Sequence, residues 1–235
     1  LHLIQEKATK WQTSTKNVVR EYLQNLILSS FYQEEESQNF LFKGGTALRI
    51  VYESPRFSED LDFSGRKNGK KYEKILISVL EEVEKEDITY ELEESKKTSG
   101  GWLSIINFEI YNEKHSIKNE ISFRKKNIKG ENQLISNDLV PPYRLMSLAP
   151  KLLVEEKLNA LVQRKKTRDL FDLYFILRNR ELKKHLDFSK MDVSKIKNII
   201  KKFDKLKVER KLKPLLPLSF HSLLKNFPNL VLKQF

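Results

Sequence analysis

FKGGTALRIVYESPRFSEDLDF, residues 42–63, is the stretch that decides the fold of this chain. The apolar residues 40–42 predict a short buried strand that ends at Gly44-Gly45. Residues 46–52 can form two helical turns, which Ser54-Pro55 ends, and residues 61–63 begin a second strand. An amphipathic helix is predicted just before this stretch, over residues 14–31. The predicted order is therefore helix, strand, helix, strand.

The rest of the chain divides into a mixed part and a helical part. We predict a helix over 70–85 and strands over 88–92, 102–111 and 117–124. The polar region 127–142 closes with Pro141-Pro142 and is the best boundary. Helices are predicted over 149–164 and 168–180, more weakly over 193–206, and again after Pro217. The fold class is α+β, with an α+β domain over 1–140 and a basic helical domain over 141–235.

Composition narrows the classes of protein. The 235 residues include no cysteine, which excludes thiol catalysis and disulfide scaffolds and favours an intracellular compartment. No run of about 18 apolar residues could span a bilayer, and the N-terminus lacks the apolar core of a signal peptide. We therefore expect a soluble, cytoplasmic protein with no membrane partner.

The charge balance favours polyanionic partners. The chain has 44 Lys and Arg residues against 32 Asp and Glu residues, a net charge of +12. Residues 178–213 alone carry 14 basic and 5 acidic residues, so the basic surface is expected to be local. Nucleic acid, nucleotides and acidic proteins all fit such a surface, and charge alone does not choose among them.

The second strand carries a candidate metal site. Alternate residues of a strand share one face, so Asp60 and Asp62 would lie side by side. Two carboxylates held so closely repel each other unless a cation lies between them, and Mg²⁺ suits such hard oxygen ligands. The alternative is a solvated strand edge, which a lone Asp-x-Asp most often is.

The glycine pair is a candidate phosphate site. Gly44 and Gly45 lie between a strand and a helix, where backbone N–H groups can approach a phosphate and Lys43 adds a cation. Many such turns use glycine for backbone reasons only. The combination is more specific than either part, because the glycine pair is followed after fourteen residues by Asp60 and Asp62.

This combination resembles the signature of the polymerase β-like nucleotidyltransferases. Within that superfamily, LFKGGTALRIVYESPRFSEDLDF is similar to the AbiEii/AbiGii toxin family, and EEKLNALVQRKKTRDLFDLYFIL, residues 155–177, resembles that family's second block. The resemblance implies a nucleotidyltransferase-like mixed sheet flanked by helices, followed by a helical domain. No motif covers the Lys-rich end.

The resemblance also implies roles for single residues. Gly44 and Gly45 would hold the nucleotide triphosphate, and Asp60 and Asp62 would bind catalytic Mg²⁺ or Mn²⁺. A third carboxylate completes the metal site in polymerase β-like enzymes, and Glu120 in IKNEISFR is our candidate. The alternative for Glu120 is an exposed strand face.

The second block supplies further candidates. Lys157 and Arg164 are seven residues apart on a helix and could reach the same anion; the resemblance suggests that Lys157 contacts the triphosphate. The functional aspartate is Asp169 or Asp172, with Asp172 favoured because it shares a face with Arg168. The alternative is a helix cap with salt bridges. Ser58 is a candidate for nucleotide binding on position alone.

The function expected from the resemblance is transfer of a nucleoside monophosphate from an NTP to an RNA acceptor, with tRNA a natural choice. Two divalent ions would assist, and a cognate antitoxin would be the protein partner. The alternatives are a protein or small-molecule acceptor, or a non-catalytic module that binds nucleotide or RNA. Three roles are possible for the Lys-rich region 178–213: a track that binds RNA, a surface that binds the antitoxin, or a solvated helix face.

Overall fold

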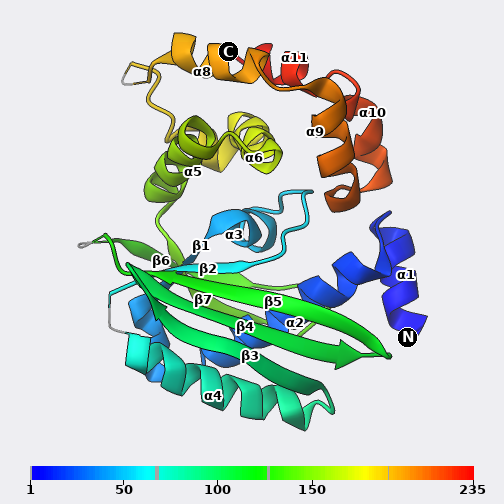
Figure 1. The fold of residues 1–235 in the computed structure, drawn as a ribbon, viewed down its shortest axis with the longest axis vertical. Helices are drawn as coiled ribbons and strands as arrows, with labels where there is room; N and C mark the ends of the chain where they lie inside the picture. Colours follow the sequence, from blue (N-terminus) through cyan, green and yellow to red (C-terminus); the bar gives the residue numbers. More distant parts are fainter. Residues whose placement is uncertain (1, 67–68, 126–127, 190) are drawn as a thin grey trace.

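The computed structural model describes residues 2–66, 69–125, 128–189 and 191–235, and in these residues one mixed sheet is the centre of the fold (Figure 1). Its strand order is β3-β4-β5-β2-β1-β7-β6. The strands are β1 (Phe40–Lys43), β2 (Leu61–Gly65), β3 (Thr89–Thr98), β4 (Gly101–Ile110), β5 (Glu113–Ser122), β6 (Gly130–Ile135) and β7 (Tyr143–Leu148). The helices are α1 (His2–Lys10), α2 (Thr15–Phe31), α3 (Gly44–Ile50), α4 (Gly69–Lys85), α5 (Pro150–Arg164), α6 (Thr167–Arg178), α7 (Arg180–Lys183), α8 (Val193–Lys201), α9 (Lys205–Leu212), α10 (His221–Leu224) and α11 (Phe227–Leu232).

The centre of the sheet is the unit formed by β1, α3 and β2. β1 and β2 are antiparallel, with Lys43 opposite Asp62, because α3 and the loop after it return the chain beside β1. β5 lies parallel to β2, and β7 lies parallel to β1. The predicted α+β class and mixed sheet are confirmed, as is the order α2, β1, α3, β2.

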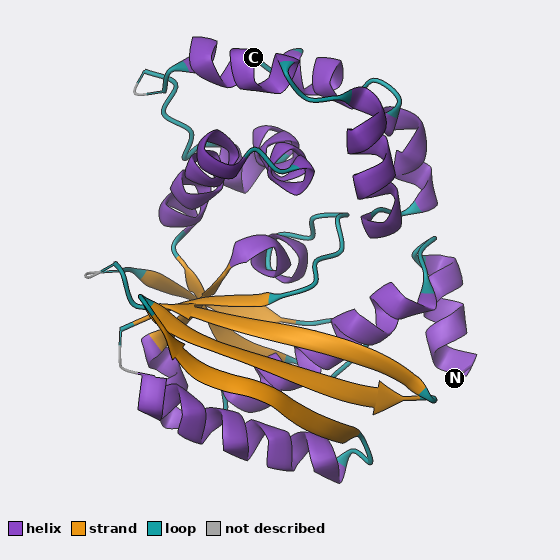
Figure 2. Ribbon diagram, viewed as in Figure 1, coloured by secondary structure: helices purple, strands orange, loops and turns teal. Residues whose placement is uncertain are grey.

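The two faces of the sheet have different neighbours. Figure 2 shows α2 and α4 under one face, and α3 with the C-terminal helices over part of the other. Aromatic rings join the lower layer, since Phe31 of α2 contacts both Phe40 and Phe63, and Tyr72 of α4 lies against Phe31. Side chains alternate along β2, so Asp62 must project to the face opposite Phe63, toward α3.

A second core holds the C-terminal helices. It contains buried side chains of α5, α6, α8, α9 and α11, and it includes Leu41 of β1 and Leu48 of α3. Phe171 and Phe227 stack there with centroids 5.5 Å apart. Because β1 and α3 contribute to this core, the helical half is fixed directly over the unit that carries the glycine pair.

Parts of the expected organisation differ. The polar region expected as a boundary contains β6 in its described residues, with residue 127 outside them, and the chain continues into β7. The expectation that nearly everything after Pro142 is helical was wrong there, because pairing with β1 and β6 outweighs a weak local pattern. The division at residues 140 and 141 stays a prediction, although β7 belongs to the sheet. No helix among the described residues has the length and apolar character to cross a membrane.

Candidate active site

The glycine pair and the second aspartate are in direct contact. Gly44 starts α3 with a φ of +84°, and a Cβ added there would lie 2.1 Å from Oδ2 of Asp62. A Cβ on Gly45 would lie 2.5 Å from Nη2 of Arg56 and 2.8 Å from Oγ of Ser58. Both glycines are therefore needed for close approach, and Gly44 also for its left-handed backbone. The predicted neighbours Gly44, Gly45, Ser58 and Asp62 do lie together.

The predicted carboxylates lie on adjacent strands. In the parallel pair of β2 and β5, Asp62 is in register with Glu120. Asp60 directly precedes β2, where its carbonyl accepts a hydrogen bond of 2.5 Å from Oγ1 of Thr46. Burial raises the pKa of both aspartates; the charge of Asp60 adds to the rise at Asp62, and Glu120 adds to it at both. Their negative charges are thus held together at an electrostatic cost.

An arrangement of three ligands around a metal is not formed by these side chains. In the described part of the chain, no three His, Cys, Asp or Glu side chains are grouped so that they could hold an ion. Glu120 instead pairs with Lys118, its neighbour on the same face of β5. The donor set at Asp60 and Asp62 is nevertheless all oxygen and mutually repelling, which is the chemistry that suits Mg²⁺ or Mn²⁺. The predicted metal ligands stay a prediction.

Behind Asp62 lies a buried charge cluster. The carboxylate of Asp172, only 1 % exposed, accepts hydrogen bonds from Nε and Nη2 of Arg56 at 2.9 and 2.8 Å and from Nζ of Lys157 at 2.8 Å. Burial alone would raise the pKa of Asp172, but the charges of Arg56 and Lys157 outweigh it and lower that pKa. Burial still raises the pKa of Asp62, but the charge of Lys157 offsets part of that rise, so its ammonium acts on both carboxylates.

This cluster changes the interpretation of the second block. The charge of Lys157 acts on Asp62, whereas Asp172 is enclosed by its two cations. The contacts of Asp172 hold Lys157 and Arg56 in place, and its predicted catalytic role stays a prediction. Arg56 was not predicted from the sequence, because nothing local signals that it pairs with a residue 116 positions away.

The other predicted residues of the second block form a helix cap. Asp169 accepts from the backbone N of Lys166 at 3.1 Å and from the Arg164 guanidinium at 3.2 and 2.9 Å. Asp169 is buried, so its carboxylate serves the first turn of α6. The capping alternative therefore describes its observed contacts, and a role in nucleotide binding stays a prediction for both residues.

Lys43 lines a cavity with the carboxylates. This cavity, of about 280 Å³, is lined by Asp62, Glu120, Lys43 and Arg124 among others. Nζ of Lys43 lies 3.0 Å from Oε2 of Glu156 on α5. Like Arg56, Glu156 was not predicted from the sequence as part of this site. The cavity is large enough for a phosphate group, and it combines carboxylates with cations.

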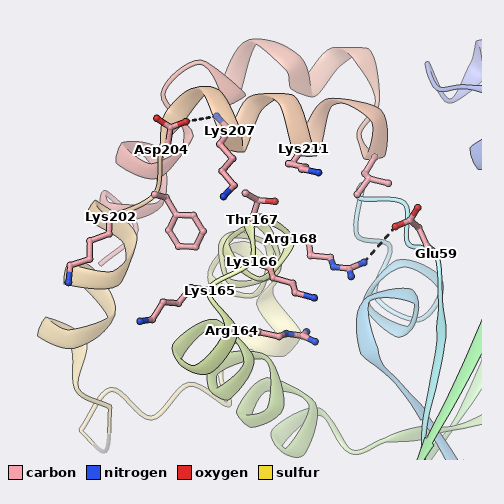
Figure 3. A pocket seen from close by; sticks show the side chains of 12 residues that line it. Glu59, Arg164, Lys165, Lys166, Thr167, Arg168, Lys202, Asp204, Lys207 and Lys211 are labelled. Carbon is pink, nitrogen blue, oxygen red and sulfur yellow. Dashed lines mark hydrogen bonds and ion pairs between the residues drawn. The ribbon is translucent and has the colours of Figure 1, made fainter. Parts of the chain in front are cut away.

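A larger, basic cleft opens next to Asp60. It has a volume of about 590 Å³ and lies between the turn joining α5 to α6 and the segment from α8 to α9 (Figure 3). Glu59 lines its edge and forms an ion pair of 3.7 Å with Arg168. Glu59 directly precedes Asp60, and the charge of Arg168 partly offsets the rise that burial causes in the pKa of Asp60.

Comparison with solved structures identifies the fold. The fold is that of nucleotidyltransferase toxins: it is similar to MenT4, a nucleotidyltransferase toxin of Mycobacterium tuberculosis, at a TM-score of 0.61 and 16 % identity over 98 % of this chain and 89 % of that one. JHP933 from Helicobacter pylori matches at 0.58 and 23 % identity over 94 % of both chains. A putative nucleotidyltransferase from H. pylori matches at 0.57 and 23 % identity, over 94 % and 96 %.

The family follows from the sequence. The family model described as "Nucleotidyl transferase AbiEii toxin, Type IV TA system" matches residues 26–228, and the chain belongs to this family. The match confirms the predicted family and covers the whole Lys-rich region 178–213, which carried no recognised motif. No curated protein gave a significant match. The protein is thus a nucleotidyltransferase toxin of the type IV toxin–antitoxin class.

Proposed function

We propose that this protein transfers a nucleoside monophosphate from an NTP to a hydroxyl of an RNA acceptor, with tRNA the favoured RNA, by a two-metal mechanism. The observation that carries the proposal is the contact between Gly44 and Asp62, with Asp60 and Lys157 beside them. Carboxylates, a phosphate-sized cavity and a buried lysine are the parts that phosphoryl transfer needs, since its catalysis is mainly positioning and electrostatics.

Each residue has a proposed role. Asp60 and Asp62 would hold the divalent ions, and Glu120, which pairs with Lys118 here, would be the third carboxylate ligand. Gly44 and Gly45 leave room for the triphosphate, and Lys43 and Ser58 lie at the edge of that space. Divalent ions, when bound, would activate the attacking hydroxyl and neutralise charge on the leaving pyrophosphate.

The residues of the helical half orient the phosphates. Lys157 neutralises triphosphate charge while Asp172 fixes its position, because Asp172 is itself held by Arg56 in the buried cluster. Arg164 extends the cation set toward the basic cleft, and Asp169 keeps the turn that carries it in place.

The reaction forms one bond and breaks one. The acceptor oxygen bonds to the α-phosphorus, the bond from that phosphorus to the bridging oxygen of the β-phosphate breaks, and pyrophosphate leaves. The acceptor proton is lost to solvent. The proposal places this reaction in the cytoplasm, under the control of a cognate antitoxin.

The test combines the purified protein with Mg²⁺, total bacterial RNA and each α-³²P-labelled NTP in turn. We expect label in an RNA band with one NTP, and none with the Asp60→Asn, Asp62→Asn variant. Asp87→Asn is the matched control, because Asp87 is exposed and its φ of +57° suits asparagine. Label in protein or in a small molecule would move the acceptor to that class. RNA binding without any label would favour the non-catalytic module.

A further inference from the structure

The basic cleft beside Asp60 has more positive charge than its surroundings neutralise. Its lining includes the lysines Lys165, Lys166, Lys202, Lys207 and Lys211. None of the five side chains forms an ion pair with another described residue; the ion pairs at this cleft are made by Arg164, Arg168 and Arg20, of which Arg20 contacts Glu59 at 3.6 Å. The two carboxylates in the lining are already engaged, Glu59 with Arg168 and Asp204 with the backbone N of Lys207 at 2.6 Å.

This charge selects a ligand with several negative charges in a row. Figure 3 shows Lys207 of α9 reaching toward Thr167 at the start of α6. Lys165 and Lys166 lie on the wall that carries Thr167, so cations line both walls of the cleft. Like charges facing one another across a gap raise its affinity for a polyanion. The α8–α9 wall offers lysines rather than arginines, and lysines contact phosphates as point charges without reading base edges in a forked geometry.

The lining also contains an aromatic ring. Phe203, between α8 and α9, is half-buried and lines the cleft next to Lys202. A ring beside a row of cations is the combination by which proteins hold single-stranded nucleic acid, because unpaired bases stack on the ring while the cations contact the backbone. A base-paired duplex would not expose its base faces to Phe203.

One end of the cleft reaches the catalytic aspartates. Glu59 lines the cleft and directly precedes Asp60, and Arg168 acts on both of them. A strand whose phosphates lie along the lysines would therefore bring its end to the position where the acceptor hydroxyl is needed.

We propose that this cleft binds the single-stranded end of the acceptor RNA, with its phosphates on the lysines and a base stacked on Phe203. The inference rests on the proposed function and adds where and how the acceptor is held. The triphosphate of the NTP is the other source of phosphates, and the test separates the two. An acidic protein, such as an antitoxin, is a competing class of partner and is an outcome of the same test.

The first experiment reverses charge on the far wall. The variant Lys202→Glu, Lys207→Glu, Lys211→Glu is compared with Lys74→Glu, Lys114→Glu, Lys183→Glu, whose lysines are equally exposed but do not line the cleft. The probes are an RNA hairpin with a single-stranded 3′ tail, the same hairpin without the tail, an NTP with Mg²⁺, and poly-glutamate.

We expect the cleft variant to bind the tailed hairpin at least tenfold more weakly than the control variant does, and to bind the NTP as the wild type does. The wild type should prefer the tailed hairpin to the blunt one. Changing the same three lysines to glutamine should weaken the salt dependence of RNA binding. The slope of the logarithm of the binding constant against the logarithm of the salt concentration is negative, and its magnitude should fall by about 2, because each contact to a single strand contributes about 0.7.

The ring is tested with Phe203→Leu against Phe203→Tyr. Leucine keeps an apolar side chain in the wall but removes the flat ring, whereas tyrosine keeps it. Stacking of one base corresponds to about a 5- to 140-fold change in affinity. We therefore expect a loss in that range for leucine and none for tyrosine.

Three results would overturn the inference: equal binding of tailed RNA by the two charge variants, loss of NTP binding with RNA binding intact, or binding of poly-glutamate but not RNA. The proposed function fails separately. If the wild type labels no acceptor, the transferase proposal is wrong; if it labels RNA and the cleft variant labels it equally well, only the cleft assignment is wrong.

Discussion

The buried cluster of Asp172, Arg56 and Lys157 allows a demanding prediction about stability. In Asp172→Asn the side chain keeps its size but loses its charge, which leaves two cations in a site where the carboxylate is 1 % exposed. Breaking a buried ion pair from one side typically costs about 3–5 kcal/mol. For a chain of this length each kcal/mol lowers the melting temperature by roughly 2–4 °C, so we expect a fall of about 6–20 °C.

The assay is thermal unfolding followed by circular dichroism, with Asp87→Asn as the exposed control, which should stay within about 0.5 kcal/mol of the wild type. Replacing the whole cluster, as in Arg56→Met, Lys157→Met, Asp172→Leu, should recover most of the lost stability, because no unpaired charge is left buried. Although its stability is recovered, that triple variant should be inactive in nucleotidyl transfer, because it lacks Lys157.

The pH dependence has a defined sign. Because the pKa of Asp172 is lowered in the folded state, its contribution is present above the ordinary value of 3.8 and is lost as the pH falls through the lower folded value. The difference between wild type and Asp172→Asn should therefore be constant near neutrality and vanish in strong acid. Melting of Asp172→Asn within 2 °C of the wild type at neutral pH would refute this account of the cluster.

Four further predictions concern the site itself. Gly44→Ala should destabilise the protein by about 1–3 kcal/mol in urea unfolding and abolish transfer, because its φ is +84° and the new Cβ would meet Asp62; unchanged stability would show that this contact is not rigid. Asp62→Asn should raise the melting temperature at neutral pH, since burial raises the pKa of Asp62 and makes its charge costly; the gain should disappear below the ordinary value of 3.8, where both states are protonated. Mg²⁺ should raise the melting temperature of the wild type but not of Asp62→Asn, and an equal rise in both would place the ion elsewhere. Glu120→Gln should increase the Mg²⁺ concentration needed for half-maximal transfer, and an unchanged requirement would remove Glu120 from the metal site.

The sequence by itself determined the central unit and its residue types. Strand, glycine pair, short helix and second strand are all encoded within residues 40–65, where side-chain alternation and backbone freedom act between near neighbours. The same local rules placed Asp62 on the face opposite Phe63 and placed Lys118 and Glu120 together on β5. They also gave alternatives that were useful, since the helix cap at Asp169 is what its observed contacts form.

Only the tertiary structure decided which distant residues meet. Arg56 and Asp172 are 116 positions apart, and Lys43 and Glu156 are 113 apart, so no periodic pattern could pair them. β7 joins the sheet because an adjacent strand satisfies its backbone, although its own sequence did not indicate a strand. The basic cleft likewise exists because the second core brings residues 202–211 over the α5–α6 turn. Local sequence fixes what each segment presents, whereas burial of the shared core selects which segments face each other.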